Sequence, residues 1–110
     1  MTVQGTARHL RIYVDGHDQR HDKALYVVIV EEARTRGLAG ATVTRGALGY
    51  GFHGSIDEPH DFRLTRGLPV VVEIVDSEEK VEAFLPYLAG LLQEGLITIS
   101  EVDVIRYDRS

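Results

Sequence analysis

The spacing of apolar residues along this chain switches between the period of a strand and the period of a helix. Leu10, Ile12 and Val14 alternate with polar or aromatic neighbours, which predicts a strand with one buried face. The residues that follow, 15–22, are polar and show no periodicity. They therefore predict a loop after the first strand.

A helix is expected next, from Lys23 to about Arg36. Asp22 suits its N-cap, and Gly37 suits the position just after its C-terminus. One face is apolar at helical spacing and consists of Leu25, Tyr26, Ile29, Val30 and Ala33. A second strand is expected over 41–48, because threonine and valine favour extended structure there.

The second half of the chain repeats this order. A third strand is expected to include Phe62 and Leu64 and to continue through Val70–Val75, with a bulge or bend at 67–69. Val70–Val75 is apolar on both of its faces, so we expect both to be covered.

A second helix is expected after this strand. Asp76 and Ser77 are candidate N-caps, and the spacing from Asp76 to Glu79 is that of a capping box. Pro86 lies inside the helix and should kink it, and Gly95 should end it. The apolar stripe of this helix consists of Val81, Phe84, Leu85, Leu88 and Leu92.

The last strand is expected over Ile97–Tyr107, with a break near 100–101 because its apolar positions change parity there. The resulting βαββαβ order predicts a ferredoxin-like split sandwich, which is an α+β fold with a four-stranded antiparallel sheet and two helices on one face. We expect one domain over 1–110 with a core of about 8–107. The helices leave one sheet face open, and another subunit would cover it economically.

Composition narrows the class of protein. The net charge of −5 argues against a general nucleic-acid binder, which needs a basic surface. No cysteine is present, which excludes disulfides and thiolate ligands. The sequence shows no secretory signal and no apolar run of the ~20 residues that span a bilayer. We therefore expect a cytoplasmic protein.

A glycine-rich segment, 45–54, joins the two halves. Gly49, Gly51 and Gly54 match a dinucleotide-binding string, but the residues that follow, 55–59, end in Pro59 and are not a helix start. Two interpretations stay open. The glycines allow a long connection to turn freely, or Arg45 and exposed glycine amides form an anion-binding nest.

Histidines offer a second candidate chemistry. His17 and His21 stand four residues apart beside aspartates, where they form either a solvated loop or a metal site. His53, His60 and Asp61 could likewise assemble a metal- or anion-dependent enzyme site from loop residues.

Five blocks of the chain resemble an uncharacterised branch of the PII-like signalling superfamily, a branch classed as a domain of unknown function. They are HLRIYV (9–14), AGATVTRG (39–46), GYG (49–51), LPVVVEIVD (68–76) and EKVEAFLP (79–86). The resemblance extends from about His9 to Tyr107. It implies a ferredoxin-like fold and a cytoplasmic homotrimer.

In PII-like proteins the connection between the second and third strands is called the T-loop. The resemblance implies that this loop, here about 46–61, docks on a target such as a membrane transporter, channel or enzyme. Small adenine nucleotides bind at its base, between subunits. Members of this branch are sometimes linked to small fluoride-export channels, which suggests one target.

The chain departs from the PII pattern at one place. Established PII proteins carry a Gly-Asp-Gly-Lys type stretch between the second helix and the last strand, where it contacts phosphates. The corresponding residues here, 92–97, contain Glu94 and no lysine. A different effector, or none, therefore stays open.

The sequence thus predicts a non-enzymatic trimeric sensor, with no catalytic or metal-binding residue. The candidate effector-binding residues are Arg45, Gly46, Gly49, Gly51, Arg63 and Arg106, since arginine forks match phosphate geometry. The candidate target-docking residues are Tyr50, Phe52, His53 and Ile56. The alternatives are the histidine-based enzyme and a trimeric interaction module without a ligand.

Overall fold

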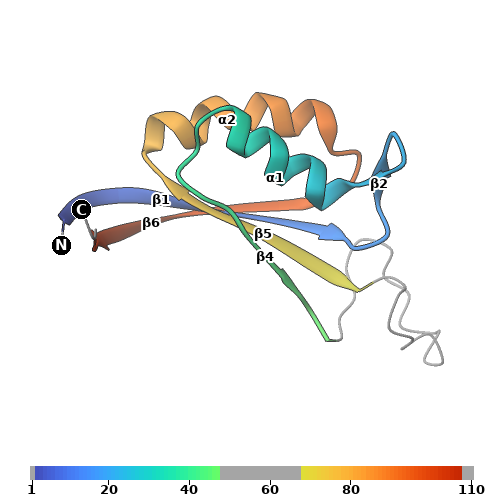
Figure 1. The fold of residues 1–110 in the computed structure, drawn as a ribbon, viewed down its shortest axis with the longest axis horizontal. Coiled ribbons are helices and arrows are strands. Elements are labelled where there is room, and N and C mark those ends of the chain that lie inside the picture. Colours follow the sequence, from blue (N-terminus) through green and yellow to red (C-terminus); the bar gives the residue numbers. More distant parts are fainter. Residues whose placement is uncertain (1, 48–67, 108–110) are drawn as a thin grey trace.

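A computed structural model describes residues 2–47 and 68–107 of the chain (Figure 1). The elements are β1 (Thr2–Asp15), β2 (Gln19–Arg20), β3 (Lys23–Ala24), α1 (Leu25–Thr35), β4 (Thr42–Arg45), β5 (Pro69–Asp76), α2 (Glu78–Leu91) and β6 (Leu96–Arg106). The expectations for 48–67 lie outside the described residues. They are Phe62 and Leu64 in the third strand, part of the bend, and the T-loop beyond residue 47, which we expect to be mobile without ligand. The second strand, β4, ends at Arg45 and does not extend to 48 as expected.

The main sheet has the strand order β4-β5-β1-β6, and every neighbouring pair is antiparallel. Both helices lie on the same side of this sheet (Figure 1). The expected ferredoxin-like fold is therefore confirmed. In the described part of the chain no helix has the length and apolar character that a membrane crossing needs.

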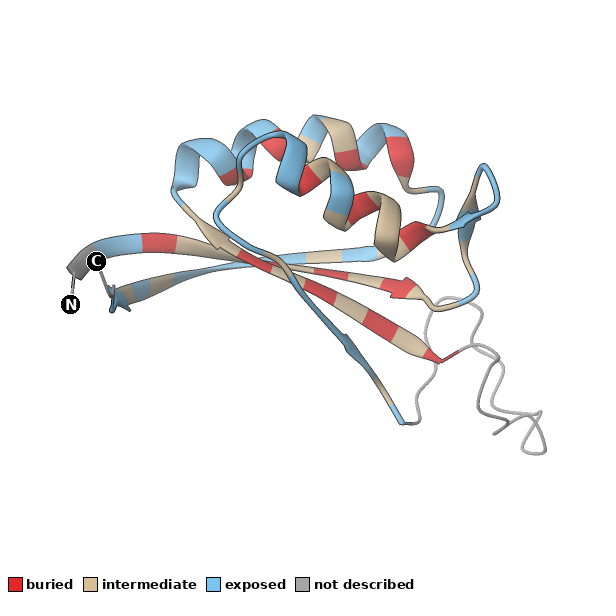
Figure 2. Cartoon of the chain, viewed as in Figure 1, coloured by how far each residue is buried: buried red, intermediate tan, exposed pale blue. Residues whose placement is uncertain are grey.

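The core lies between the sheet and the helices (Figure 2). Alternate residues of β1 face alternate residues of β5 in register, with Leu10 opposite Ile74 and Ile12 opposite Val72. All four side chains are at most 1% exposed. The helices close this layer with Leu25, Ile29, Ala33, Val81, Phe84, Leu88 and Leu91. The period-two and helical patterns therefore identified the buried faces correctly.

The connection before α1 differs from the prediction. Residues 19–24 form a small hairpin, β2 with β3, rather than an irregular loop. His21 and Asp22 occupy its turn with positive φ values of 53° and 66°, as a tight hairpin turn requires. Asp22 therefore does not cap α1. The helix begins at Leu25, and its N-cap position is Ala24, without a side-chain hydrogen bond.

The predicted stop of α1 at Gly37 is confirmed. Gly37 has a φ of 78°, which favours glycine over other residues. Its amide donates to the Arg34 carbonyl at 3.0 Å, and the Leu38 amide donates to the Ala33 carbonyl at 3.0 Å. This is the Schellman pattern of a helix end. Lys80 of α2 also donates its Nζ to the Gly37 carbonyl at 3.0 Å.

Helix α2 follows the predicted cap but ends early. Ser77 is the N-cap, because its Oγ accepts from the Lys80 amide at 3.2 Å. Asp76 instead accepts from the Ala39 amide at 2.8 Å, so it joins the end of β5 to the α1–β4 connection. The helix continues through Pro86 to Leu91, not to Gly95, since the backbone becomes extended at Leu92.

Strand β6 shows no break near 100–101, and that prediction was wrong. Its pairing with β1 is regular from Leu96 to Val104, and the only shift of register in this pair lies on β1, between Val3 and Gly5. The change of parity instead moves the apolar side chains from the helix face, where Ile97 and Ile99 lie, to the opposite face, where Val102 pairs with Ala7. The helices lie over only part of the long β1–β6 pair, which extends well beyond them (Figure 1).

The sheet face opposite the helices mixes apolar and charged side chains. Val71 and Val75 of β5 are half-buried in a single chain. Between them, Glu73 lies 2.7 Å from His9 Nε2 and 3.6 Å from Arg11 Nε. The expectation that β5 is apolar on both faces therefore holds except at Glu73, whose charge is paired across the sheet.

Replacement of Gly37 by Ala should lower the free energy of unfolding by about 1 kcal/mol, because only a residue without Cβ adopts its φ without strain. No atom lies within 4 Å of the added Cβ, so strain is the only cost. Gly40→Ala is the matched control, since Gly40 has open space and no positive φ. Urea denaturation measures both; equal stability of the two variants would contradict this account.

Candidate functional site

One end of the sheet brings together residues that are far apart in the sequence. The register pairs Asp15 with Pro69 and Arg45 with Val70, so the ends of β1 and β4 meet the start of β5. Pairing of Tyr13 with Leu96 brings the start of β6 to the same end. The connection between β4 and β5 therefore leaves and returns here (Figure 1).

Two glycines hold the returning strand in place. The Gly16 amide donates to the Leu68 carbonyl at 2.9 Å, and the Gly46 amide donates to the Pro69 carbonyl at 2.8 Å. A Cβ on Gly46 would lie 2.6 Å from Pro69 Cγ, closer than real contacts allow. Gly46 therefore serves close packing, and its amide is already engaged with protein.

Arg45 lies on the helix side of β4, because it shares a face with the buried Val70. Its Nη2 donates to the Tyr26 hydroxyl at 3.1 Å, and its Cζ lies 5.6 Å from the centre of the Tyr26 ring. A Cβ on Gly16 would be 3.2 Å from Arg45 Nη1. The side chain is nevertheless exposed, so an anion from solvent can reach it.

Of the other predicted effector residues, Arg106 does not join this group within one chain. Arg106 pairs with Thr2, at the opposite end of the β1–β6 pair from Tyr13 and Leu96. Gly49, Gly51 and Arg63 lie outside the described residues, as do the predicted docking residues Tyr50, Phe52, His53 and Ile56.

Only one of the two histidine alternatives lies within the described residues. Within 2–47 and 68–107, no group of three or more His, Asp or Glu side chains is placed to hold a metal ion. His17 and His21 are exposed. His53, His60 and Asp61 lie outside the described ranges.

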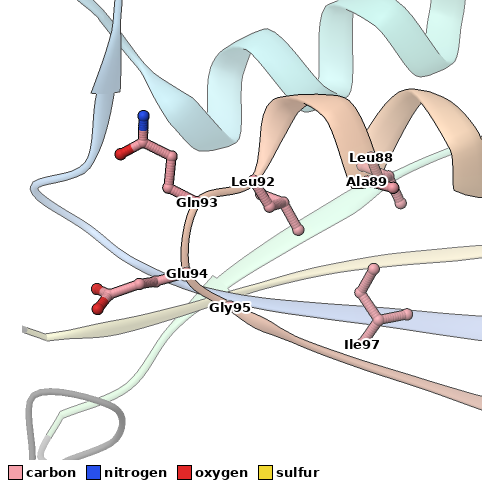
Figure 3. A pocket seen from close by; sticks show the side chains of 7 residues that line it. All are labelled: Leu88, Ala89, Leu92, Gln93, Glu94, Gly95 and Ile97. Carbon is pink, nitrogen blue, oxygen red and sulfur yellow. The ribbon is translucent and has the colours of Figure 1, made fainter.

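The sequence did not predict a cavity of about 460 Å³ between the end of α2 and the start of β6. Apolar side chains from both elements line one side of it, whereas Gln93 and Glu94 extend away from them (Figure 3). At Gly95 the connection between α2 and β6 packs closely against β1. A Cβ there would lie 3.2 Å from the Tyr13 carbonyl oxygen. The lining residues are Leu88, Ala89, Leu92, Gln93, Glu94, Gly95 and Ile97.

The fold is shared with solved PII-like structures. A Thermus thermophilus protein described as PII-like signalling aligns with a TM-score of 0.66 at 20% identity, over 96% of this chain and 94% of that one. CPII from Thiomonas intermedia, a nitrogen regulatory PII-like protein bound to ADP, AMP and bicarbonate, aligns with a TM-score of 0.59 at 23% identity, over 92% and 90% of the two chains.

Sequence relatives cover nearly the whole chain. A UPF0166 protein of Aquifex aeolicus is 44% identical over 87% of this chain and 90% of its own length. A UPF0166 protein of Methanocaldococcus jannaschii is 37% identical over 91% and 93%. The DUF190 family model, described as "Uncharacterized ACR, COG1993", matches residues 7–104. The chain therefore belongs to the DUF190 family, with the fold of PII-like signalling proteins.

Proposed function

We propose that this protein is a non-enzymatic PII-like regulator that senses a small anionic effector. The observation that carries the proposal is Arg45, an exposed cation held at the base of the β4–β5 connection by Tyr26. A guanidinium matches the oxygens of a phosphate or carboxylate group. CPII, which shares the fold, binds ADP, AMP and bicarbonate, so an adenine nucleotide is the first effector to test.

The regulator would act through assembly and a docking loop. On the open sheet face, Leu96 is 49% exposed, and Val71 and Val75 are half-buried. Three copies with these faces turned inward would bury such side chains, and contact along the sheet edges would place a second chain near β4, the strand that carries Arg45. The loop 46–61, which includes Tyr50, Phe52, His53 and Ile56, would then contact a transporter, channel or enzyme when the effector is bound.

In this proposal Arg63 and Arg106 would also contact the anionic effector, either from a neighbouring copy or from the segment between β4 and β5. Arg106 lies at the far end of β6 in its own chain, so it would reach an effector only at a subunit boundary. Gly49 and Gly51 would contribute amides to the same anion. If the protein binds no anionic ligand, the alternative that remains is a trimeric interaction module without a ligand.

Replacement of Arg45 by Ala should weaken binding of the effector by about one to two orders of magnitude, because a charge-assisted hydrogen bond contributes ~1.5–3 kcal/mol. Isothermal titration calorimetry with ADP, AMP and ATP, each with and without bicarbonate, measures the affinity. Arg34→Ala is the matched control, since Arg34 is an exposed arginine of α1. Equal affinities of the wild type and the Arg45 variant would remove Arg45 from the site.

Replacement of Val71 by Glu should convert the trimer to monomers, because an unpaired carboxylate buried in an apolar interface costs several kcal/mol per subunit. Light scattering at micromolar concentration measures the mass, and circular dichroism checks the fold. Ala83→Glu places the same charge on the exposed side of α2 and should leave the trimer intact. A monomeric wild type would refute the assembly.

A further inference from the structure

Two arginines on the helix side of the protein lie against tyrosine rings, but their surroundings differ. Arg36 Cζ lies 4.8 Å from the centre of the Tyr87 ring, and Arg36 Nε pairs with Glu32 Oε2 at 2.7 Å. Burial, with Glu32 nearby, raises the pKa of the Tyr87 hydroxyl, which therefore stays a neutral phenol. This first pair is a neutralised structural contact between the two helices.

The Arg45–Tyr26 pair has a different character. Arg45 contacts the hydroxyl and the aromatic face of Tyr26, and neither group carries a negative charge that would pair with the guanidinium. Tyr26 itself is partly buried and packs against the hydrophobic core. The contact therefore links a cation on the short edge strand β4 to a residue of α1 that packs on the core.

The same guanidinium also lies close to Gly16. Any Cβ at position 16 would lie 3.2 Å from Arg45 Nη1, and it would also press on Val70 Cγ2 at 3.2 Å. The guanidinium thus contacts Tyr26 through Nη2, while its Nη1 lies near Gly16. An arginine side chain held in this way keeps few of the rotamers it has in water.

We propose that Tyr26 is a positioning residue, which holds the Arg45 fork ready for an anionic ligand; this rests on the proposed function. The Tyr26 hydroxyl occupies one N–H of Nη2, and the contact fixes the plane in which the other donors of the fork lie. Planar donors in a fixed orientation favour two oxygens of one group, as in a phosphate or bicarbonate. Binding then loses less side-chain entropy than it would with a free arginine.

A double-mutant cycle separates positioning from general packing. Tyr26→Phe keeps the ring but removes the hydroxyl, so the affinity for ADP, or for bicarbonate titrated alone, should fall about three- to tenfold. In the Arg45→Ala background the same change should alter the affinity less than about twofold, because nothing is left to position. Tyr87→Phe, at the neutralised pair, is the matched control and should bind like the wild type.

The outcomes distinguish this inference from the proposed function. Equal weakening by Tyr26→Phe in both backgrounds would overturn positioning while leaving the effector site in place. A wild type that binds neither ADP nor bicarbonate would refute the effector proposal instead. The ligand-free NMR signal of Arg45 Nε–Hε then still decides on the contact: Tyr26→Phe should shift it and speed its exchange with water, and an unchanged signal would overturn the inference.

Discussion

The pairing of β1 with β5 is the interaction on which the rest of the molecule depends. Leu10, Ile12 and Val14 face three buried residues of β5, and the helices pack on that shared strip. A slip of a single residue would turn the apolar strip of one strand toward solvent, so burial of this layer fixes the register. The fixed register in turn determines which residues meet at each end of the sheet.

The candidate site follows directly from that register. Because Arg45 lies opposite Val70, it shares the helix face and reaches Tyr26 on α1. A shift by one position would place its side chain on the open face instead. The close contacts of Gly16 and Gly46 with the start of β5 keep this alignment at the point where regular pairing stops.

The sequence predicted the elements whose signal is local and missed the contacts that depend on distant partners. Apolar periodicity located the buried strips, and Gly37 marked the end of α1, because each signal lies within a few residues. The hairpin turn at His21–Asp22 lacks the usual glycine, so its positive φ values carried no clear signal. Nothing in the sequence indicated that Tyr26 contacts Arg45, since the sheet and α1 must pack before the two residues meet.

The position of each feature on the sheet bears on the proposed assembly. Arg45 lies at the β4 edge, whereas the cavity beside Glu94 lies at the β6 edge, and β5 and β1 separate them. One small ligand could therefore use both only where the β4 edge of one copy meets the β6 edge of another. Such a contact uses two different surfaces, and it closes into a ring when three equal rotations return to the first copy. Under the proposed function, assembly and effector binding would then be coupled, because the ligand would contribute to the stability of the interface that completes its site.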